Sequence, residues 1–116
     1  MKVFIGPREE MYHTNSIEIH NYDTWNLEVT IARIIHPALV RYKEVSQYYG
    51  HIDDEDTPLP YQNGDDYEQA KWNYFLDTII ATFALICQKE MNLGNDLPFV
   101  QEGLRLFGKY YLHLWN

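Results

Sequence analysis

A run of carboxylates is the first feature of this sequence that could do chemistry. His51 is followed by four consecutive acidic residues at positions 53–56. Carboxylate oxygens of this kind bind Ca²⁺ or Mg²⁺. A calcium loop of the EF-hand type beginning at Asp53 needs glycine at its sixth position, where this chain has Pro58, so that pattern fails. We expect a solvated acidic loop, with a weak Mg²⁺ site as the alternative, and assign no metal.

Motifs for covalent or cofactor chemistry are missing from the sequence. The five histidines show no HExxH pattern or close pairing suited to zinc, and there is no GxSxG, P-loop or GxGxxG segment. We therefore predict no catalytic residues and no cofactor. One enzymatic alternative stays open, a metal-assisted phosphodiesterase. It would use Asp53, Asp54 and Asp56, with His51 or Asp77.

The long cations offer a different chemistry, the binding of an anion. Arg33 and Arg41 are eight residues apart, a little over two helical turns, and so share a face unless Pro37 rotates them apart. If the first and third predicted helices pack side by side, their arginine side chains would bind a phosphate and their aromatic rings would stack on a base, which suits a nucleotide. Solvent-facing cations are the alternative. The predicted ligand-binding set is Tyr22, Trp25, Arg33, His36, Arg41, Arg105, Lys109 and Tyr110.

The elements that must position these residues can be predicted from apolar periodicity. Residues 2–5 read as a short strand that Gly6-Pro7 stops, and residues 16–20 alternate apolar and polar as a second strand that we expect to pair with it in a hairpin. An N-cap at Asp23-Thr24 begins a helix of about 25 residues that ends near Gly50, with a kink or break at His36-Pro37. An irregular loop covers residues 50–65, and a second helix runs from about 66 to 91.

A third helix is capped by Asp96 and tolerates Pro98 in its first turn. Its C-terminal stretch, residues 103–116, is too apolar to be a frayed tail, so we expect it to dock. Read as a helix, it places Leu104, Phe107, Tyr111 and Leu114 on one face. Gly103 and Gly108 weaken this helix, and we expect close packing against another helix to compensate. The fold class is mainly α, a three-helix bundle-like domain with a short N-terminal β-hairpin.

Size and charge narrow the classes of partner. The 116 residues predict a single domain, 1–116, with a net charge of −8. Seven acids and no lysine or arginine lie in residues 51–70, whereas residues 1–50 hold six acids against five bases. So uneven a charge argues against duplex nucleic acid as a ligand. No secretory signal or membrane-spanning run is visible, and the single Cys87 excludes an internal disulfide, so we expect a cytosolic protein.

Several segments resemble a family of small, mostly uncharacterised proteins of tailed bacteriophages. They are KVFIGP at 2–7, the YDTW-containing stretch 19–39, HIDDEDTP at 51–58, KWNYFLDTIIATF at 71–83 and GLRLFGKYYLHLW at 103–115. Together they touch most of the chain in the family's order. The chain departs from the pattern with His36 in place of leucine and Thr78 in place of glutamate. The resemblance implies a phage product in the host bacterial cytoplasm and supplies no catalytic residues.

These observations favour a binding function over catalysis. The first hypothesis is counter-defence by sequestration: a homo-oligomer that captures a nucleotide signal of host immunity without cleaving it, in pockets between subunits. The alternative is a protein–protein inhibitor or adaptor that acts on a host or phage enzyme through aromatic residues and the acidic loop, which would steer a basic partner.

Overall fold

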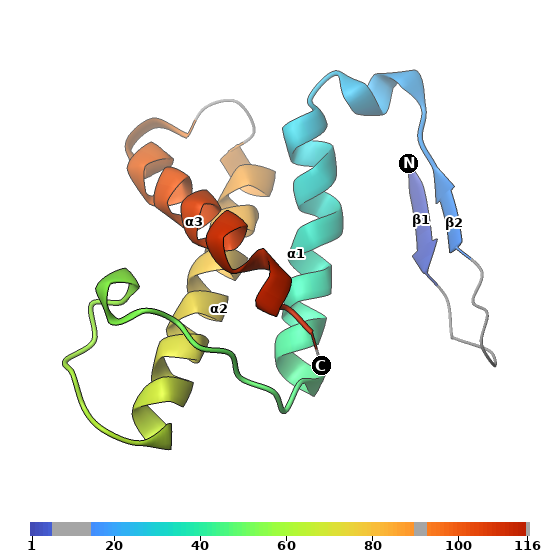
Figure 1. The fold of residues 1–116 in the computed structure, drawn as a ribbon. Coiled ribbons are helices and arrows are strands. Elements are labelled where there is room, and N and C mark those ends of the chain that lie inside the picture. Colours follow the sequence, from blue (N-terminus) through green and yellow to red (C-terminus); the bar gives the residue numbers. More distant parts are fainter. Residues whose placement is uncertain (6–14, 90–92, 116) are drawn as a thin grey trace.

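The computed structural model describes residues 1–5, 15–89 and 93–115 of the chain, and these form an N-terminal hairpin followed by three helices (Figure 1). The mainly α fold predicted from the sequence is confirmed. The strands are β1 (Lys2–Ile5) and β2 (Asn15–Glu18), which pair antiparallel, with Val3 opposite Ile17. The helices are α1 (Leu27–Val45), α2 (Asp65–Lys89) and α3 (Leu97–Tyr110). Short 3₁₀ turns are η1 (Asn21–Thr24), η2 (Asp54–Asp56), η3 (Gly94–Asp96) and η4 (Tyr111–His113).

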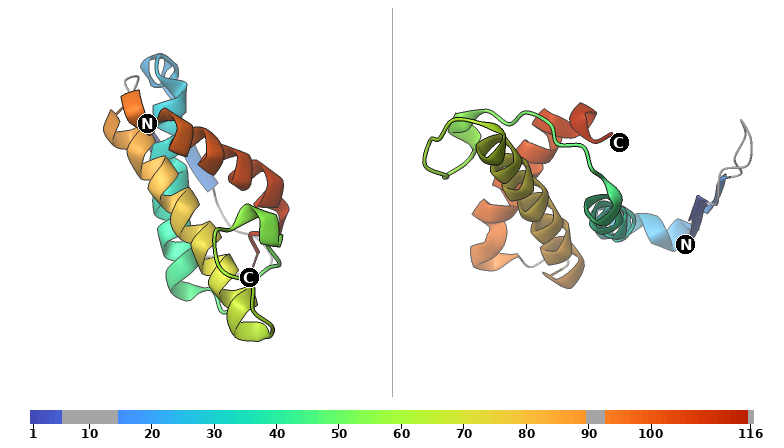
Figure 2. Two further views of the ribbon diagram at one scale, coloured as in Figure 1. Left: turned by 90° about the vertical axis from the view of Figure 1, so that its left-hand side faces the viewer. Right: turned by 90° about the horizontal axis from the view of Figure 1, so that it is seen from below.

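Helix α2 is the centre of the fold, because both other helices pack on it. It contributes the largest buried side chains, among them Trp72, Phe75 and Ile79. Ala32 of α1 and Leu106 of α3 meet this core from two sides. Helices α1 and α3 therefore each lie against α2, and α3 crosses it at an angle (Figures 1 and 2). The side-by-side packing of the first and third helices that the nucleotide pocket required is not an extensive contact of this fold.

Helix α1 differs from its prediction at both ends and in the middle. Asp23 does not cap it; this carboxylate accepts from the His20 amide at 2.9 Å and closes η1 instead. The helix then continues through Pro37 without the predicted break. Proline removes one backbone donor, and the packing of α1 on α2 holds the helix together on both sides of it. It ends at Val45, since Ser46 takes an extended backbone and its hydroxyl accepts from the Tyr48 amide at 3.2 Å.

The connection from α1 to α2 crosses the end of the molecule and is anchored to the core. Gly50 lies against the indole of Trp72, where a Cβ would come within 2.9 Å of Cζ3, so a larger residue does not fit there without movement. Ile52 is fully buried. These two contacts bring the acidic residues that follow close to α2 and α3.

Helix α3 packs through a face that the sequence did not predict. Its buried residues are Val100, Gly103, Leu106 and Tyr110, whereas Leu104 and Tyr111 of the predicted face are exposed. The prediction was wrong because glycine carries no apolar signal, and Gly103 lies directly against Thr82 of α2. Phe107 and Leu114 do pack against the core. Compensation by close packing holds for Gly103, whereas a Cβ on Gly108 would meet nothing within 4 Å.

The C-terminal residues dock, as their apolar character predicted. The Tyr42 hydroxyl of α1 donates to the Trp115 carbonyl oxygen at 2.9 Å, and the Trp115 ring lies 4.3 Å from that of Tyr48. These contacts tie the end of the described chain to the C-terminal half of α1. Among the described helices, none combines the length and the apolar character that crossing a bilayer requires.

Candidate functional site

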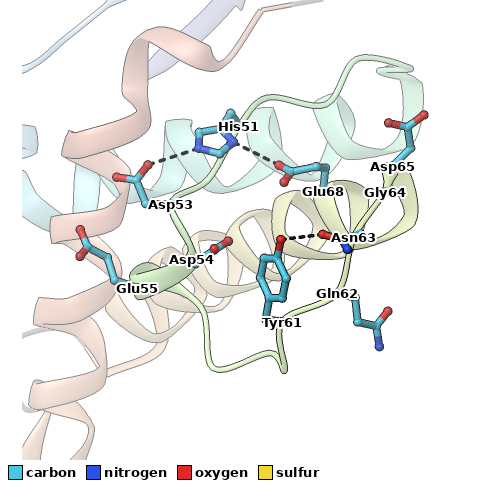
Figure 3. Close-up of a pocket in the computed structure, with 10 residues that line it drawn as sticks. All are labelled: His51, Asp53, Asp54, Glu55, Tyr61, Gln62, Asn63, Gly64, Asp65 and Glu68. Atoms are coloured by element: carbon cyan, nitrogen blue, oxygen red, sulfur yellow. Dashed lines mark hydrogen bonds and ion pairs between the residues drawn. The ribbon is translucent and has the colours of Figure 1, made fainter.

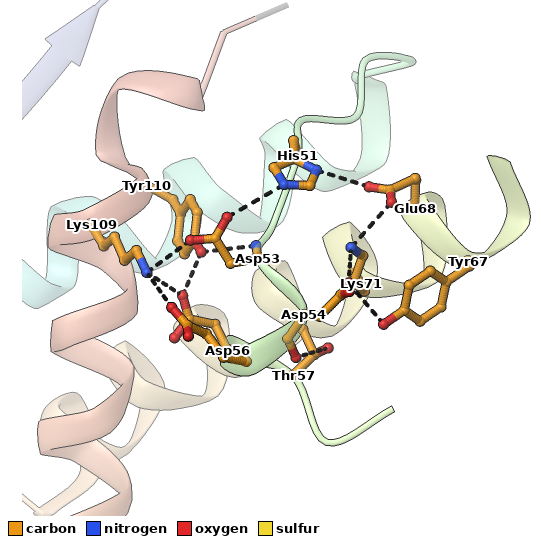
Figure 4. Close-up of polar contacts among 11 residues, drawn as sticks. His51, Asp53, Asp54, Asp56, Thr57, Tyr67, Glu68, Lys71, Lys109 and Tyr110 are labelled. Carbon is orange, nitrogen blue, oxygen red and sulfur yellow. Dashed lines mark hydrogen bonds and ion pairs between the residues drawn. The ribbon is translucent and has the colours of Figure 1, made fainter. Parts of the chain in front are cut away.

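Asp56 is the hub of the polar contacts that hold the acidic loop to α3 (Figure 4). Its side chain is only 4% exposed. One carboxylate oxygen accepts from Arg105 at 2.8 Å, and the other accepts from Lys109 at 2.7 Å and from the Tyr110 hydroxyl at 2.5 Å. Burial raises the pKa of Asp56, but the hydrogen bonds from Lys109, Tyr110 and Arg105 outweigh burial and leave the pKa well below its ordinary value. Asp56 is therefore ionised at neutral pH and fixes the loop in place.

Asp54 anchors the same loop to α2. The ammonium of Lys71, which is fully buried, donates to Asp54 at 2.7 Å and lies 3.1 Å from a Glu68 oxygen. The Tyr67 hydroxyl donates to the same Asp54 oxygen at 3.0 Å. Burial lowers the pKa of Lys71, but the hydrogen bonds to Asp54 and Glu68 outweigh it and raise the pKa. A buried ammonium is tolerated here because two carboxylates face it.

Between these two anchors lies an open basin of about 770 Å³, which we call the acidic basin (Figure 3). Its lining residues are His51, Asp53, Asp54, Glu55, Tyr61, Gln62, Asn63, Gly64, Asp65 and Glu68. Gly64 has φ of +104°, a backbone conformation that glycine adopts easily and that turns the chain into α2. The ring of Tyr61 is 69% exposed and forms part of the wall.

The charge of the acidic basin is negative. Five carboxylates line it, and the two ammonium groups beside it, those of Lys71 and Lys109, are already bonded to carboxylates. His51 lies between Asp53 at 3.4 Å and Glu68 at 3.1 Å. Hydrogen bonding to Lys109 holds the pKa of Asp53 below its ordinary value, and bonding to Lys71 does the same for Glu68. The basin therefore keeps its negative charge at neutral pH and attracts cationic groups.

The carboxylates of Asp53, Glu55 and Asp56 lie close enough together to hold a metal ion. The Lys109 ammonium, however, lies among them, at 3.1 Å from Asp53, 3.8 Å from Glu55 and 2.7 Å from Asp56. A divalent ion would have to displace this lysine. The expectation of a solvated acidic loop is thus corrected: two of its four consecutive acids are structural anchors, because basic residues of α2 and α3 point at them.

The eight residues predicted to bind a ligand fall into separate surroundings. Tyr22, Trp25 and Arg33 line one shallow depression of about 160 Å³ at the start of α1. Trp25 is 80% exposed, and Arg33 has no hydrogen bond or ion pair within the described part of the chain. Part of the predicted pocket is therefore assembled here, by one helix and the turn before it.

The other five predicted residues are placed differently. Arg105, Lys109 and Tyr110 bind Asp56 and so have their donors engaged by the chain itself. Arg41 is exposed and pairs with Glu44 at 3.0 Å, and His36 is half-buried in the middle of α1. In the alternative phosphodiesterase set, Asp77 bonds Lys43 of α1 rather than joining the acidic loop.

Sequence reasoning missed several residues of the acidic basin, above all Tyr61, Asp65 and Glu68, and missed Lys71 beside it. One signal was available: Glu68 and Lys71 are three residues apart on a helix, a spacing that pairs opposite charges. The pairing of Lys71 with Asp54, 17 residues earlier, has no local signature. Comparison with protein-family models, with characterised proteins and with solved structures finds no match for this chain.

Proposed function

We propose that this protein is a non-catalytic binding module that holds a basic segment of another protein in the acidic basin. The observation that carries the proposal is the basin itself: a 770 Å³ hollow with five carboxylates and an exposed tyrosine ring. Lysine and arginine side chains fit this chemistry, because carboxylates pair with their charge and the ring of Tyr61 offers a cation–π contact. This is the inhibitor or adaptor role, with a basic partner.

Rigidity of the basin supports the same role. The loop that forms one wall is held to α3 by Asp56 and to α2 by Asp54, and Lys109 and Lys71 hold the Asp53 and Asp54 carboxylates in place before a partner arrives. A preorganised site loses less conformational entropy on binding. The excess of acids in residues 51–70 would also accelerate the approach of a basic partner at low salt. The resemblance to phage proteins supports a host or phage enzyme as that partner.

A titration of the protein with a hexa-arginine peptide, followed by calorimetry, tests the proposal. We expect binding that weakens with salt and weakens at least tenfold in the double variant Glu55→Gln/Asp65→Asn. Asp65→Asn alone should also weaken binding, and its matched control is Asp66→Asn, which removes one charge from the neighbouring exposed position that does not line the basin. Equal losses in Asp65→Asn and Asp66→Asn would mean diffuse charge attraction and would overturn the proposal, as would no binding by the wild type.

Capture of a nucleotide is the second candidate, supported by the depression at Tyr22, Trp25 and Arg33. The Arg33 guanidinium, which has no carboxylate partner among the described residues, lies beside an exposed indole, an arrangement that suits a phosphate and a base. A thermal-shift screen with cyclic and ADP-ribose nucleotides tests it. A bound nucleotide should raise the melting temperature, be recovered intact after denaturation, and lose its effect in Arg33→Ala. Arg41→Ala is the matched control and should keep the effect; no shift with any nucleotide removes this candidate.

A further inference from the structure

A second apolar face runs along α1, on the side that does not meet α2. We define this outer face by Leu27, Ile31, Ile34, Ala38 and Val45. These positions are spaced by four, three, four and seven residues, the spacing of a helix that packs on another helix. Leu27, Ile31, Ala38 and Val45 are exposed, and Ile31 is 42% accessible. The residues of α1 that enter the core, Ala32 and Leu39, lie more than 100° around the helix from this face.

The hairpin stands on the same side of α1 and leaves this face uncovered. Figures 1 and 2 show β1 and β2 beside α1, away from α2 and α3. The strands pair with each other and make no extensive contact with the described helices. An ion pair of 3.3 Å between the Met1 amino group and Asp23 fixes β1 to η1, while Ile17 on β2 is exposed. A two-stranded hairpin is marginal in water unless something packs on it.

The exposed area of the chain is larger than a compact monomer needs. Its accessible surface is 8295 Å², whereas a monomer of 13.9 kDa is expected to expose about 6,700 Å². The Cα radius of gyration is 16.2 Å, against about 13 Å for a compact chain of this length. The excess area of roughly 1,600 Å² falls within the roughly 1,000–2,500 Å² that each subunit of an obligate dimer buries.

We propose that a second copy of this chain packs on the outer face of α1, with the two α1 helices antiparallel about a two-fold axis. In this antiparallel arrangement Leu27 lies opposite Val45 of the second copy, and Ile34 lies opposite Ala38 of the second copy. The small side chain of Ala38 lets the helices approach. The hairpin of each copy then has the other copy's helix within reach, which gives it the apolar partner that it lacks in one chain.

Charge favours a second copy on this face and decides the direction of the helices. Residues 1–50, which supply the interface, hold six acids and five bases, so two copies meet there with little repulsion. The seven acids of residues 51–70 lie on the far side of α2 (Figure 1). Between Ala38 and Val45, the position that continues the same three- and four-residue spacing is occupied by Arg41. Parallel helices would stack it on its own copy, whereas antiparallel helices set it opposite Ile31 of the second copy and keep the two guanidinium groups apart.

Sedimentation equilibrium at micromolar concentration tests the proposal on the full chain. The expected mass is twice 13.9 kDa, and Leu27→Asp should weaken association by about 100-fold or more, because it places a carboxylate against the apolar Val45 of the second copy. Leu104→Asp is the matched control: Leu104 is 42% exposed, close to the 46% of Leu27, but lies on α3. It should keep the dimer mass. A monomeric wild type, or equal dissociation in the two variants, would overturn the proposal.

Disulfide trapping tests the direction of the helices in a Cys87→Ser background, with helical circular dichroism to confirm that each variant folds. A mixture of Leu27→Cys and Val45→Cys chains should form a mixed cross-linked dimer under mild oxidation. Each variant alone should stay largely uncross-linked. Rapid cross-linking of Leu27→Cys with itself would instead show parallel helices and refute the antiparallel arrangement.

Discussion

The contact between α2 and α3 at Gly103 gives the sharpest quantitative prediction. A Cβ on Gly103 would lie 1.7 Å from Thr82 Oγ1 and 2.7 Å from Thr82 Cβ. Thr82 is fully buried, and its hydroxyl donates to the Thr78 carbonyl oxygen at 2.8 Å. Rotation of the threonine side chain would move Oγ1 away, but its Cβ would still be too close. Gly103→Ala therefore forces the two helices apart.

The net cost follows from two opposing effects. Overpacking of a core costs about 1–3 kcal/mol, and loss of the Thr82 hydrogen bond adds about 1 kcal/mol. Alanine forms helices more readily than glycine, so the replacement stabilises the helix by about 1 kcal/mol. We expect Gly103→Ala to lower the free energy of unfolding by about 2 kcal/mol. Gly108→Ala is the matched control: a Cβ there meets nothing within 4 Å, so helix propensity alone should raise stability by about 0.5–1 kcal/mol.

Urea denaturation followed by circular dichroism measures both variants, with a double-mutant cycle through Thr82→Ala. Because Thr82→Ala removes Oγ1 and Cγ2, the double variant should lose less stability than the sum of the two single variants. If Gly103→Ala is as stable as the wild type, α3 does not approach α2 at this point. If Gly108→Ala is destabilised equally, the effect belongs to the helix and not to the contact.

Three further predictions concern the anchors of the fold. Asp56→Ala should lower the free energy of unfolding in urea by about 2–4 kcal/mol, since it removes the buried acceptor of three hydrogen bonds that tie the loop to α3; Glu55→Ala, at the exposed neighbour, should change it by less than about 0.5 kcal/mol. Folding lowers the pKa of Asp56. The stability that ionised Asp56 contributes is therefore present above the unfolded pKa of about 3.9 and is lost as pH falls through the folded pKa, so wild-type stability should drop below about pH 5. Asp56→Ala should flatten that drop, and parallel stability–pH curves for the two proteins would contradict this. Lys71→Met should lower the free energy of unfolding by about 1–3 kcal/mol in the same assay, because it removes one partner of a buried ion pair and leaves the carboxylates of Asp54 and Glu68 without their shared donor, and a variant as stable as the wild type would contradict it. Truncation before Trp115 removes its contacts with Tyr42 and Tyr48 and should lower the melting temperature measurably.

Local patterns determined the elements of this fold. Alternation in the second strand, the 3.6-residue periodicity of α2 and the Asp96–Pro98 start of α3 each depend on neighbouring residues, and the structure has these elements close to their predicted bounds. Docking of the C-terminal residues was also predicted from composition, and it holds for Leu114 and the Trp115 carbonyl, whereas Leu112 is 86% exposed. The prediction failed where two local signals competed, as at Pro37, where tertiary packing kept the helix continuous.

Tertiary structure alone decided the roles of individual side chains. Asp53, Asp54 and Asp56 are chemically equivalent in the sequence, yet only Asp56 is buried against α3, and only Asp54 meets the buried Lys71. The sequence thus determined where the negative charge lies, and the packing of the helices determined which carboxylates are anchors and which remain open to a ligand. The reason is physical: hydrophobic periodicity acts over a few residues, whereas an ion pair depends on distances between segments that only the folded chain brings together.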